Sequence, residues 1–163
     1  MRKKPLPKIA KLKKTDLHQL RSLISNISNF KKFEKDCALE LIEFALKNKT
    51  QNDYIIYTAK INGIPAGFII YGWIDLTKGC YDLYWIAVDN NFRDKGIGKR
   101  LIQSMEKNIK KDGGRAVFIE TSSKTNYTST RIFYEKCGYK KTAVIKDFYD
   151  KNDHKIIYRK NIR

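Results

Sequence analysis

Apolar residues spaced three or four positions apart predict two amphipathic helices in the first third of the chain. The first covers residues 17–27 and follows Thr15 and Asp16, whose side-chain oxygens can cap a helix. Its repeating apolar residues are Leu17, Leu20, Leu23, Ile24 and Ile27. The second helix is expected from about residue 34 to residue 48. A short alternating segment, residues 8–12, precedes both helices and is typical of a strand.

Strand patterns dominate the middle of the chain. Residues 54–61 and 64–74 form two apolar runs joined at Asn62-Gly63, the dipeptide that best accepts the positive φ angles of a tight hairpin. Residues 81–88 are dense in aromatic and β-branched side chains and predict a third long strand. A helix with one apolar face follows from residue 97 and is closed by Asp112-Gly113-Gly114. Residues 115–121 are almost continuously apolar, as expected for a strand in a parallel pair covered on both faces.

The last part of the chain predicts a helix over residues 129–137, stopped by Gly138, and a hairpin of strands at residues 139–148 and 154–160. The strand–helix–strand order of residues 81–121 is typical of a right-handed βαβ crossover. We therefore expect an α+β fold, with a mixed and mostly antiparallel central sheet, a parallel βαβ unit in its middle, and helices on both faces. The length of 163 residues predicts one domain spanning residues 1–163, in which residues 1–7 form a flexible basic arm.

Charge and cysteine content narrow the choice of partners. The net charge of +17, from 34 Lys and Arg against 17 Asp and Glu, attracts anions such as nucleic acid, an acidic membrane surface or a phosphorylated cofactor. No apolar signal-peptide core follows the basic start, and the longest apolar-rich run, residues 61–74, falls short of the ~20 residues of a spanning helix. We expect no membrane partner. Cys37, Cys80 and Cys137 have neither metal-site nor disulfide spacing, which favours a reducing cytoplasm and no metal.

The segment VDNNFRDKGIGKRLIQSM, residues 88–105, contains an arrangement that is unfavourable unless an anion binds to it. Gly96 and Gly98 open a helix, and the absence of Cβ atoms exposes backbone N–H groups that can bind phosphate. Four cations crowd the helix N-terminus, where the helix dipole disfavours positive charge: Arg93, Lys95, Lys99 and Arg100. Arg93 and Arg100 stand where a Walker loop needs Gly and Ser or Thr, and Leu101 stands where a dinucleotide fingerprint needs its third glycine. The alternative is an ordinary glycine turn with solvated lysines.

Arg93-x-x-Gly96-x-Gly98, between a strand and a helix, resembles the pyrophosphate loop of the GNAT superfamily of acetyl-CoA-dependent N-acetyltransferases. TRIFYEKCGY, residues 130–139, is similar to the second GNAT signature. The segments YDLYWIAVD, ETSS, FYEKCGY and IKDFYD together resemble a small bacterial branch whose substrate is unknown. The resemblance implies a single N-acetyltransferase domain that transfers an acetyl group from acetyl-CoA to a primary amine of a small molecule or a protein. The transfer is expected to be direct, through a ternary complex.

The resemblance also assigns candidate cofactor contacts. Backbone N–H groups of Ile86, Ala87 and Val88 are expected to bind the pantetheine arm and to face the thioester carbonyl. The pyrophosphate is expected on the loop residues Arg93, Asp94, Lys95, Gly96, Ile97, Gly98 and Lys99. Many members have an Asn seven residues before the signature tyrosine. Tyr127 holds that place here and Asn126 precedes it, so both are candidate coenzyme A contacts.

Tyr134 matches the family's general acid, which protonates the departing thiolate; the alternative is a core aromatic residue. The candidate general bases are Asp82, in a strand where aspartate is disfavoured, and Glu120, which ends the neighbouring strand. The alternative for each carboxylate is a structural ion pair.

Two groups of polar residues carry weaker expectations. His18 and His154 have no partner pattern and are interpreted as surface residues. Three aspartates of the terminal hairpin would suit a cationic amine or serve as turn residues: Asp147, Asp150 and Asp153.

Two other functions fit the same sequence. A basic nucleic-acid-binding protein would use the +17 charge, but no aromatic-basic interleaving or recognition-helix pattern is present, so nucleic acid is not the expected partner. A non-catalytic coenzyme A-binding regulator would keep the glycine loop and lose the chemistry. The expected partner is therefore an amine-bearing acceptor, and the expected assembly is a monomer or a homodimer.

Overall fold

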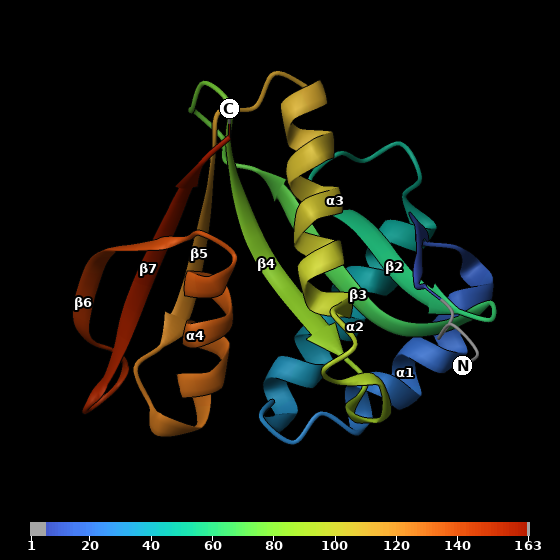
Figure 1. Cartoon of the computed structure of the whole chain (residues 1–163), viewed down its shortest axis with the longest axis horizontal. Helices are drawn as coiled ribbons and strands as arrows, with labels where there is room; N and C mark the ends of the chain where they lie inside the picture. The colour runs from blue at the N-terminus through green and yellow to red at the C-terminus, as the bar shows by residue number, and fades with distance from the viewer. Residues whose placement is uncertain (1–5, 163) are drawn as a thin grey trace. The chain divides into compact units, whose positions relative to one another are not determined.

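The computed structural model describes residues 6–162, so most of the expected basic arm lies outside the described residues. Seven strands are hydrogen-bonded in the order β1-β2-β3-β4-β5-β7-β6 (Figure 1). β4 (Cys80–Val88) and β5 (Ala116–Ser122) pair in parallel. The pairs β1–β2, β2–β3, β5–β7 and β6–β7 are antiparallel. This mixed, mostly antiparallel sheet with a parallel pair confirms the predicted fold class.

The chain divides into two compact units, which are described separately. The first consists of the residues up to Gly72 together with Trp85–Met105, and the second of Trp73–Tyr84 with the residues from Glu106 onward.

The first unit contains two complete helices, the beginning of a third, and the strands that precede β4. The complete helices are α1 (Leu17–Ser25) and α2 (Lys32–Lys47), and the strands are β1 (Lys8–Lys11), β2 (Ile55–Ile61) and β3 (Ile64–Trp73), the last of which ends in the second unit. The β2–β3 turn falls at Asn62-Gly63, with φ angles of 52° and 82°. These left-handed angles are the ones that the dipeptide predicts.

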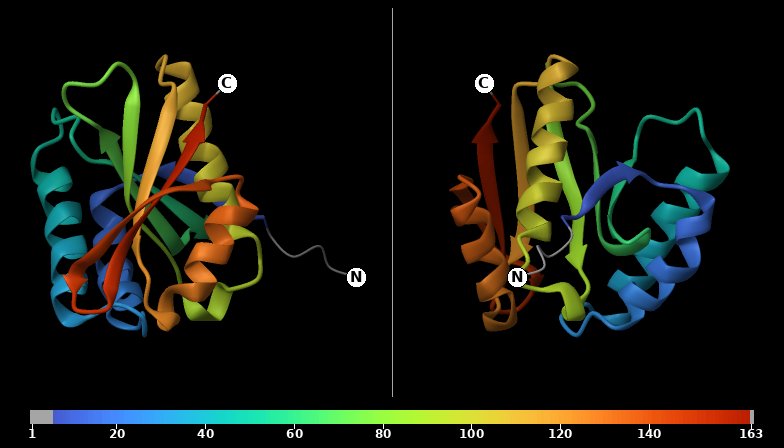
Figure 2. Two further views of the ribbon diagram at one scale, coloured as in Figure 1. Left: turned by 90° about the vertical axis from the view of Figure 1, so that its left-hand side faces the viewer. Right: turned by 45° about the vertical axis from the view of Figure 1, so that its right-hand side comes forward.

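Helices cover both faces of β3 in the first unit (Figure 2). Phe68 and Ile70 are fully buried in an apolar cluster with α1 and α2. Gly67 precedes Phe68 and therefore faces the opposite side of the strand. There it meets Ile97 and Leu101, which are buried in the first turns of α3 (Ile97–Lys111). The packing fixes the start of α3, and with it the end of the glycine loop, against the sheet.

Gly67 sets how closely β3 approaches the end of β4. A Cβ atom at this position would lie 2.8 Å from the Ala87 carbonyl oxygen and 3.2 Å from Ile97 Cγ2. Because the backbone oxygen cannot swing aside, Gly67→Ala is expected to lower the free energy of unfolding by about 1–3 kcal/mol. Ile64→Ala, at the exposed start of the same strand, should change it by no more than about 0.5 kcal/mol. Urea unfolding compares the two variants, and equal stability would contradict this packing.

The second unit contains β5, the hairpin of β6 (Lys140–Asp150) and β7 (Asp153–Asn161), helix α4 (Thr128–Lys136) and most of β4. Helix α4 packs on one face of its strands, where the Tyr134 ring centroid lies 6.1 Å from that of Tyr158 on β7. The strand residues on this face are buried: Val117, Ile119, Ile156 and Tyr158. Of the side chains that alternate with them, Phe118, Ile157 and Arg159 are partly exposed and Glu120 is exposed.

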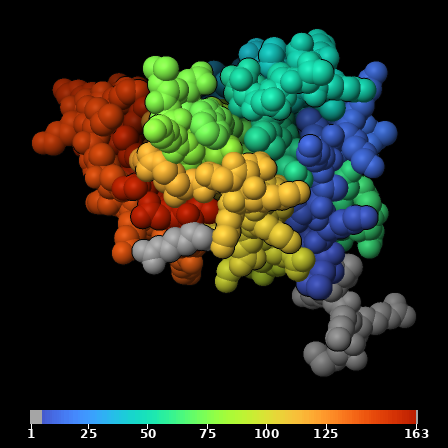
Figure 3. Space-filling view, turned by 90° about the horizontal axis from the view of Figure 1, so that it is seen from above, coloured from blue at the N-terminus to red at the C-terminus, as the bar shows by residue number. Residues whose placement is uncertain are grey.

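The loop before β4 and the loop before β5 pack on each other within the second unit. Figure 3 shows the loop at residues 74–79 beside residues 112–115. The Arg115 backbone N–H donates to the Gly79 carbonyl (2.7 Å), and Arg115 Nε donates to the Lys78 carbonyl (2.5 Å). Gly114 has no room for a side chain, because a Cβ atom there would lie 2.7 Å from Tyr81 Cε2. These contacts hold the beginnings of β4 and β5 side by side.

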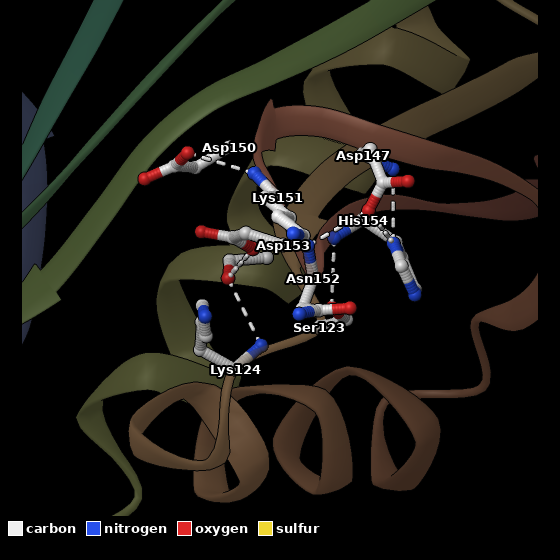
Figure 4. A network of polar contacts seen from close by, with 9 residues as sticks. Ser123, Lys124, Asp147, Asp150, Lys151, Asn152, Asp153 and His154 are labelled. Carbon is white, nitrogen blue, oxygen red and sulfur yellow. Dashed lines mark hydrogen bonds and ion pairs between the residues drawn. The ribbon is translucent and has the colours of Figure 1, made fainter.

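Polar contacts tie the end of β5 to the β6–β7 hairpin (Figure 4). Ser122 Oγ donates to the buried carboxylate of Asp153 and accepts a hydrogen bond from the Lys124 N–H (3.0 Å). Ser123 Oγ accepts from the His154 N–H (2.8 Å). Asp153 is therefore a structural residue of this junction.

The tip of the same hairpin is held by its own side chains (Figure 4). Asp147 Oδ1 accepts from the Asn152 N–H (2.8 Å), and Asp150 Oδ1 accepts from the Lys151 N–H (2.7 Å). These contacts favour the turn interpretation of the hairpin aspartates. His154 Nδ1 accepts from the Asp147 N–H (2.9 Å). His154 shows no partner pattern in the sequence, because its partner comes from across the hairpin, and its side chain is partly exposed.

Candidate functional site

The glycine loop between β4 and α3 lies in the first unit and turns through left-handed backbone. Asp94 has a φ of 59° and Gly96 a φ of 71°. A Cβ atom at Gly96 would meet nothing within 4 Å, so backbone conformation, not crowding by the protein, favours glycine here. Gly98 is not among the positive-φ residues and lies in the first turn of α3. The two glycines thus have different reasons to be present.

Three backbone donors are left over at the start of α3. The first hydrogen bond of the helix is donated by the Arg100 N–H to the Gly96 carbonyl (3.1 Å). The N–H groups before it, those of Ile97, Gly98 and Lys99, have no acceptor among residues 6–162. Ile97 itself is buried, which fixes the direction of these donors. Such a group of backbone donors forms an anion-binding site.

Three of the four cations around this helix start have no ion-pair partner among residues 6–162. Lys95 Nζ donates to the Asn91 carbonyl (3.2 Å) and lies 4.6 Å from the centre of the Phe92 ring, so it braces the loop. The other three make no ion pair with any described residue: Arg93, Lys99 and Arg100. The loop therefore combines free N–H donors with unpaired positive charge, which suits a pyrophosphate.

The end of β4 lies beyond its pairing with β5. The parallel register runs from Cys80 with Ala116 to Leu83 with Ile119, whereas β4 continues to Val88. Ile86, Ala87 and Val88 therefore fall in the part of β4 that this register does not include. The sequence predicted this segment as the pantetheine site only through the family resemblance, and that role stays a prediction.

Tyr134 belongs to a cluster of three tyrosines in the second unit, and it differs from its neighbours in one respect. Tyr139 donates to Glu106 Oε1 (3.0 Å) and Tyr158 donates to Glu135 Oε1 (2.9 Å). The Tyr134 hydroxyl has no hydrogen-bond partner within the described chain. Burial raises the pKa of Tyr134 above its ordinary value, so the phenol stays protonated at neutral pH. The role of Tyr134 as general acid stays a prediction.

The two candidate bases lie on neighbouring strands of the second unit but have different surroundings. Glu120 forms an ion pair with Lys155 on β7, with 2.6 Å between Oε2 and Nζ. Lys155 Nζ also lies 3.6 Å from the centre of the Phe148 ring. Asp82 makes no ion pair within residues 6–162. Burial raises the pKa of Asp82, the charge of Glu120 raises it further, and Lys155 opposes both effects. The structure brings Asp82, Glu120 and Lys155 into one electrostatic group.

Asn126 and Tyr127 lie in a single 3₁₀ turn, η3 (Thr125–Tyr127), between β5 and α4. Asn126 is exposed and Tyr127 is partly exposed. Arg131 fixes this turn, because its Nη1 donates to the carbonyls of Ser122 (2.7 Å) and Lys124 (2.9 Å). Arg131 was missed in the sequence, where it was one more cation in a helix. Its only available signal was its position one turn into the helix after ETSS.

Within residues 6–162, no group of three or more His, Cys, Asp and Glu side chains is arranged to hold a metal ion. No helix in this part of the chain is long and apolar enough to cross a membrane. Cys37, Cys80 and Cys137 form no disulfide among the described residues.

The chain is similar to solved structures and to one protein family. No curated protein sequence matches the chain. A crystal structure described as a GNAT-family protein, from Desulfovibrio desulfuricans, is 34% identical, with a TM-score of 0.92 over 96% of this chain and 99% of that one. The ribosomal-protein-S18-alanine N-acetyltransferase of Escherichia coli is 21% identical, with a TM-score of 0.75 over 96% of this chain and 94% of that one. An aminoglycoside 6'-N-acetyltransferase complexed with coenzyme A is 20% identical, with a TM-score of 0.74 over 96% of this chain and 97% of that one.

The last two similarities are similarities of fold. The model of the acetyltransferase (GNAT) family itself matches residues 17–139, which is most of the chain. The chain therefore belongs to the GNAT family of acetyltransferases and is an acyltransferase.

Proposed function

We propose that the protein is an N-acetyltransferase that uses acetyl-CoA as co-substrate and acetylates a primary amine in a ternary complex. One observation carries the proposal: the N–H groups of residues 97–99 have no acceptor in the described chain, beside unpaired Arg93 and Arg100. Backbone donors at a helix start with adjacent arginines match the pyrophosphate of coenzyme A. The coenzyme A complex of the related fold supports this choice of ligand.

The remaining cofactor contacts are proposed from their place along the chain. The N–H groups of Ile86–Val88, beyond the β4–β5 register, would bind the pantetheine arm and polarise the thioester carbonyl. Asn126 and Tyr127 would contact coenzyme A from the turn that Arg131 holds. Within the loop, Lys95 would act mainly as a brace, because it already contacts Asn91 and Phe92.

Acetyl transfer needs a neutral amine as the nucleophile, and the departing thiolate must gain a proton. The neutral amine nitrogen attacks the thioester carbonyl carbon, a C–N bond forms and the C–S bond breaks. Asp82, directly or through a water molecule, accepts the proton that the amine loses. Tyr134, whose proton burial keeps on the hydroxyl at neutral pH, donates that proton to the departing sulfur.

We propose Asp82 and not Glu120 as the base. The Glu120 carboxylate is already engaged by Lys155, with 2.6 Å between Oε2 and Nζ. Asp82 has no such partner in the described chain, and both its burial and the Glu120 charge raise its pKa toward the range that suits a base. Glu120 and Lys155 then act on Asp82 through their charges.

The proposed role of Asp82 predicts opposite pH shifts for two variants. The base must be ionised, so kcat/KM falls as the pH drops through the pKa of Asp82. Glu120→Gln removes the charge that raises this pKa and should move the acidic limb to lower pH. Lys155→Met removes the charge that lowers it and should move the limb to higher pH.

The measurement is kcat/KM against pH with one fixed acceptor, so that titration of the free amine is the same for every variant. Lys141→Met, on exposed β6, serves as the charge control and should leave the limb in place. Shifts of the same sign for Glu120→Gln and Lys155→Met would refute Asp82 as the base.

Binding and transfer test the proposed function separately. Calorimetry is expected to show coenzyme A binding, weakened when the nucleotide portion is omitted and pantetheine alone is offered. Acetyl-CoA with a panel of amines should release free thiol in an amine-dependent manner. Coenzyme A binding without any transfer would indicate the non-catalytic regulator instead.

The location and assembly proposed for this enzyme are those expected from the sequence. A cytoplasmic location fits three cysteines that form no disulfide in the described chain. We propose that residues 1–163 act as one domain, as a monomer or a homodimer.

A further inference from the structure

One face of the strands in the second unit is left open by helix α4. The central residues of β5 and β7 on the Tyr134 side are buried, whereas on the other side Phe118, Ile157 and Arg159 are partly exposed and Glu120 is exposed. The open face carries the proposed base and a mixture of charges. Its residues on β4, β5 and β7 are Asp82, Phe118, Glu120, Lys155, Ile157 and Arg159.

The strand register aligns four of the open-face residues in one row. Asp82 on β4 is opposite Phe118 on β5, Phe118 is opposite Arg159 on β7, and Arg159 is opposite Lys140 on β6. Paired residues on adjacent strands project from the same face, and adjacent strands lie about 4.8 Å apart. The backbone of Arg159 is therefore about 10 Å from that of Asp82. The row runs from a carboxylate, across an aromatic ring, to two cations.

Arg159 is the unsatisfied member of this row. It makes no ion pair with any residue between 6 and 162, although Lys155 and Lys160 on the same strand pair with Glu120 and Glu106. Its Nε atom is shielded from solvent and has no hydrogen-bond acceptor. The guanidinium carbon lies 5.8 Å from the centre of the Phe118 ring, which restricts its orientation.

A shielded N–H without an acceptor is rare in folded proteins, and here it belongs to a side chain whose planar fork matches a carboxylate. Lys140 beside it adds positive charge and no acceptor. A carboxylate would supply both the missing acceptor and the opposite charge.

We propose that the acceptor is an amino carboxylate, a small molecule whose carboxylate binds Arg159 while its amine lies at Asp82. This inference rests on the proposed acetyl transfer and adds the substrate class. The separation along the row suits a free amino acid or a similarly short compound, because the Arg159 guanidinium lies 5.8 Å from the ring of Phe118, the residue between Arg159 and Asp82 in the row. A polycationic acceptor is disfavoured, because it would meet Arg159 and Lys140 with like charge.

Matched acceptors test the proposal. Amino acids, including β-alanine and lysine, are compared with the corresponding carboxamides, which keep the amine and lose the negative charge. For the preferred pair, kcat/KM of the carboxylate should exceed that of the amide by about tenfold or more. Arg159→Gln should bring this ratio close to one, mainly by raising KM for the acceptor, while KM for acetyl-CoA stays unchanged. Arg159→Lys should restore part of the preference.

Lys141→Gln is the matched control, because Lys141 is opposite Tyr158 and so projects from the other face of β6. It removes one positive charge and should leave the ratio unchanged. Thermal unfolding checks that each variant is folded.

Binding separates this inference from the proposed function. The N-acetyl amino acid and its amide are titrated into the coenzyme A complex by calorimetry. If carboxylate-selective binding is seen and is lost in Arg159→Gln, the Arg159 site stands even without turnover. If the wild-type enzyme is active but its carboxylate-to-amide ratio of kcat/KM is near one and is unchanged by Arg159→Gln, the amino carboxylate proposal is overturned. Acetyl transfer then still stands. If the protein shows neither turnover nor carboxylate-selective binding, both the amino carboxylate proposal and acetyl transfer are overturned.

Discussion

Gly98→Glu is expected to weaken coenzyme A binding by roughly a hundredfold or more, while the protein stays folded. The substitution places a carboxylate among the three N–H groups of residues 97–99 that have no acceptor in the described chain. That carboxylate would compete with and repel the pyrophosphate. The helix itself should gain, because an acidic residue in the first turn complements the helix dipole by a few tenths of a kcal/mol, and Gly is a poor helix former.

Two measurements are needed for Gly98→Glu: calorimetric titration with coenzyme A, and thermal unfolding without ligand. Gln103→Glu is the control, since it adds the same charge at an exposed position further along α3. It should bind coenzyme A normally. A Gly98→Glu variant with wild-type affinity would mean that the pyrophosphate does not lie at this helix start.

Tyr134→Phe is expected to lower kcat by about a hundredfold, with little change in stability or in KM for acetyl-CoA. The hydroxyl makes no hydrogen bond in the described chain, so its removal costs the fold little. What is lost is the proton for the departing thiolate. Initial rates of thiol release, measured with saturating acceptor, give the result.

Tyr139→Phe is the matched control from the same cluster. It removes the hydrogen bond to Glu106 and should lower the free energy of unfolding by about 1 kcal/mol. Its kcat should stay near that of the wild type. If Tyr139→Phe lowered kcat and Tyr134→Phe lowered only the stability, the assignment of Tyr134 as the general acid would be wrong.

Local patterns were enough to predict nearly every element of the fold. The 3.6-residue period of α1, the Asn62-Gly63 turn and the apolar run of β5 depend on neighbours in sequence, and each appears where expected. The parallel pairing of β4 with β5 was expected from the βαβ rule. The position of β7 between β5 and β6 was not predicted, because it depends on long-range pairing. The hairpin tip was less predictable, because the His154–Asp147 contact depends on an irregular β6–β7 register that no periodicity reveals.

The candidate site could be predicted where a sequence motif marks it. It could not be predicted where its residues meet only through strand pairing. Gly96 and Gly98 were expected to act alike, but only Gly96 has left-handed backbone. Backbone conformation therefore explains glycine at position 96 and not at position 98. Asp82 and Glu120 were equal candidates, because the ion pair that separates them comes from Lys155, on a strand far along the chain. Period-two alternation of HKIIYRK does place Lys155 and Arg159 on one face. Which residues they would meet there required the pairing of β5 with β7.

The most direct test of the central claim is amine-dependent acetyl transfer by the purified protein. Acetyl-CoA is incubated with the amine panel, free thiol is followed over time, and the acetylated acceptor is identified by mass spectrometry. We expect thiol release that requires an amine, equals the acetylated product mole for mole, falls sharply in Tyr134→Phe and is absent in Gly98→Glu. A wild-type protein that binds coenzyme A yet releases no thiol beyond the amine-free background would contradict acetyl transfer as its function.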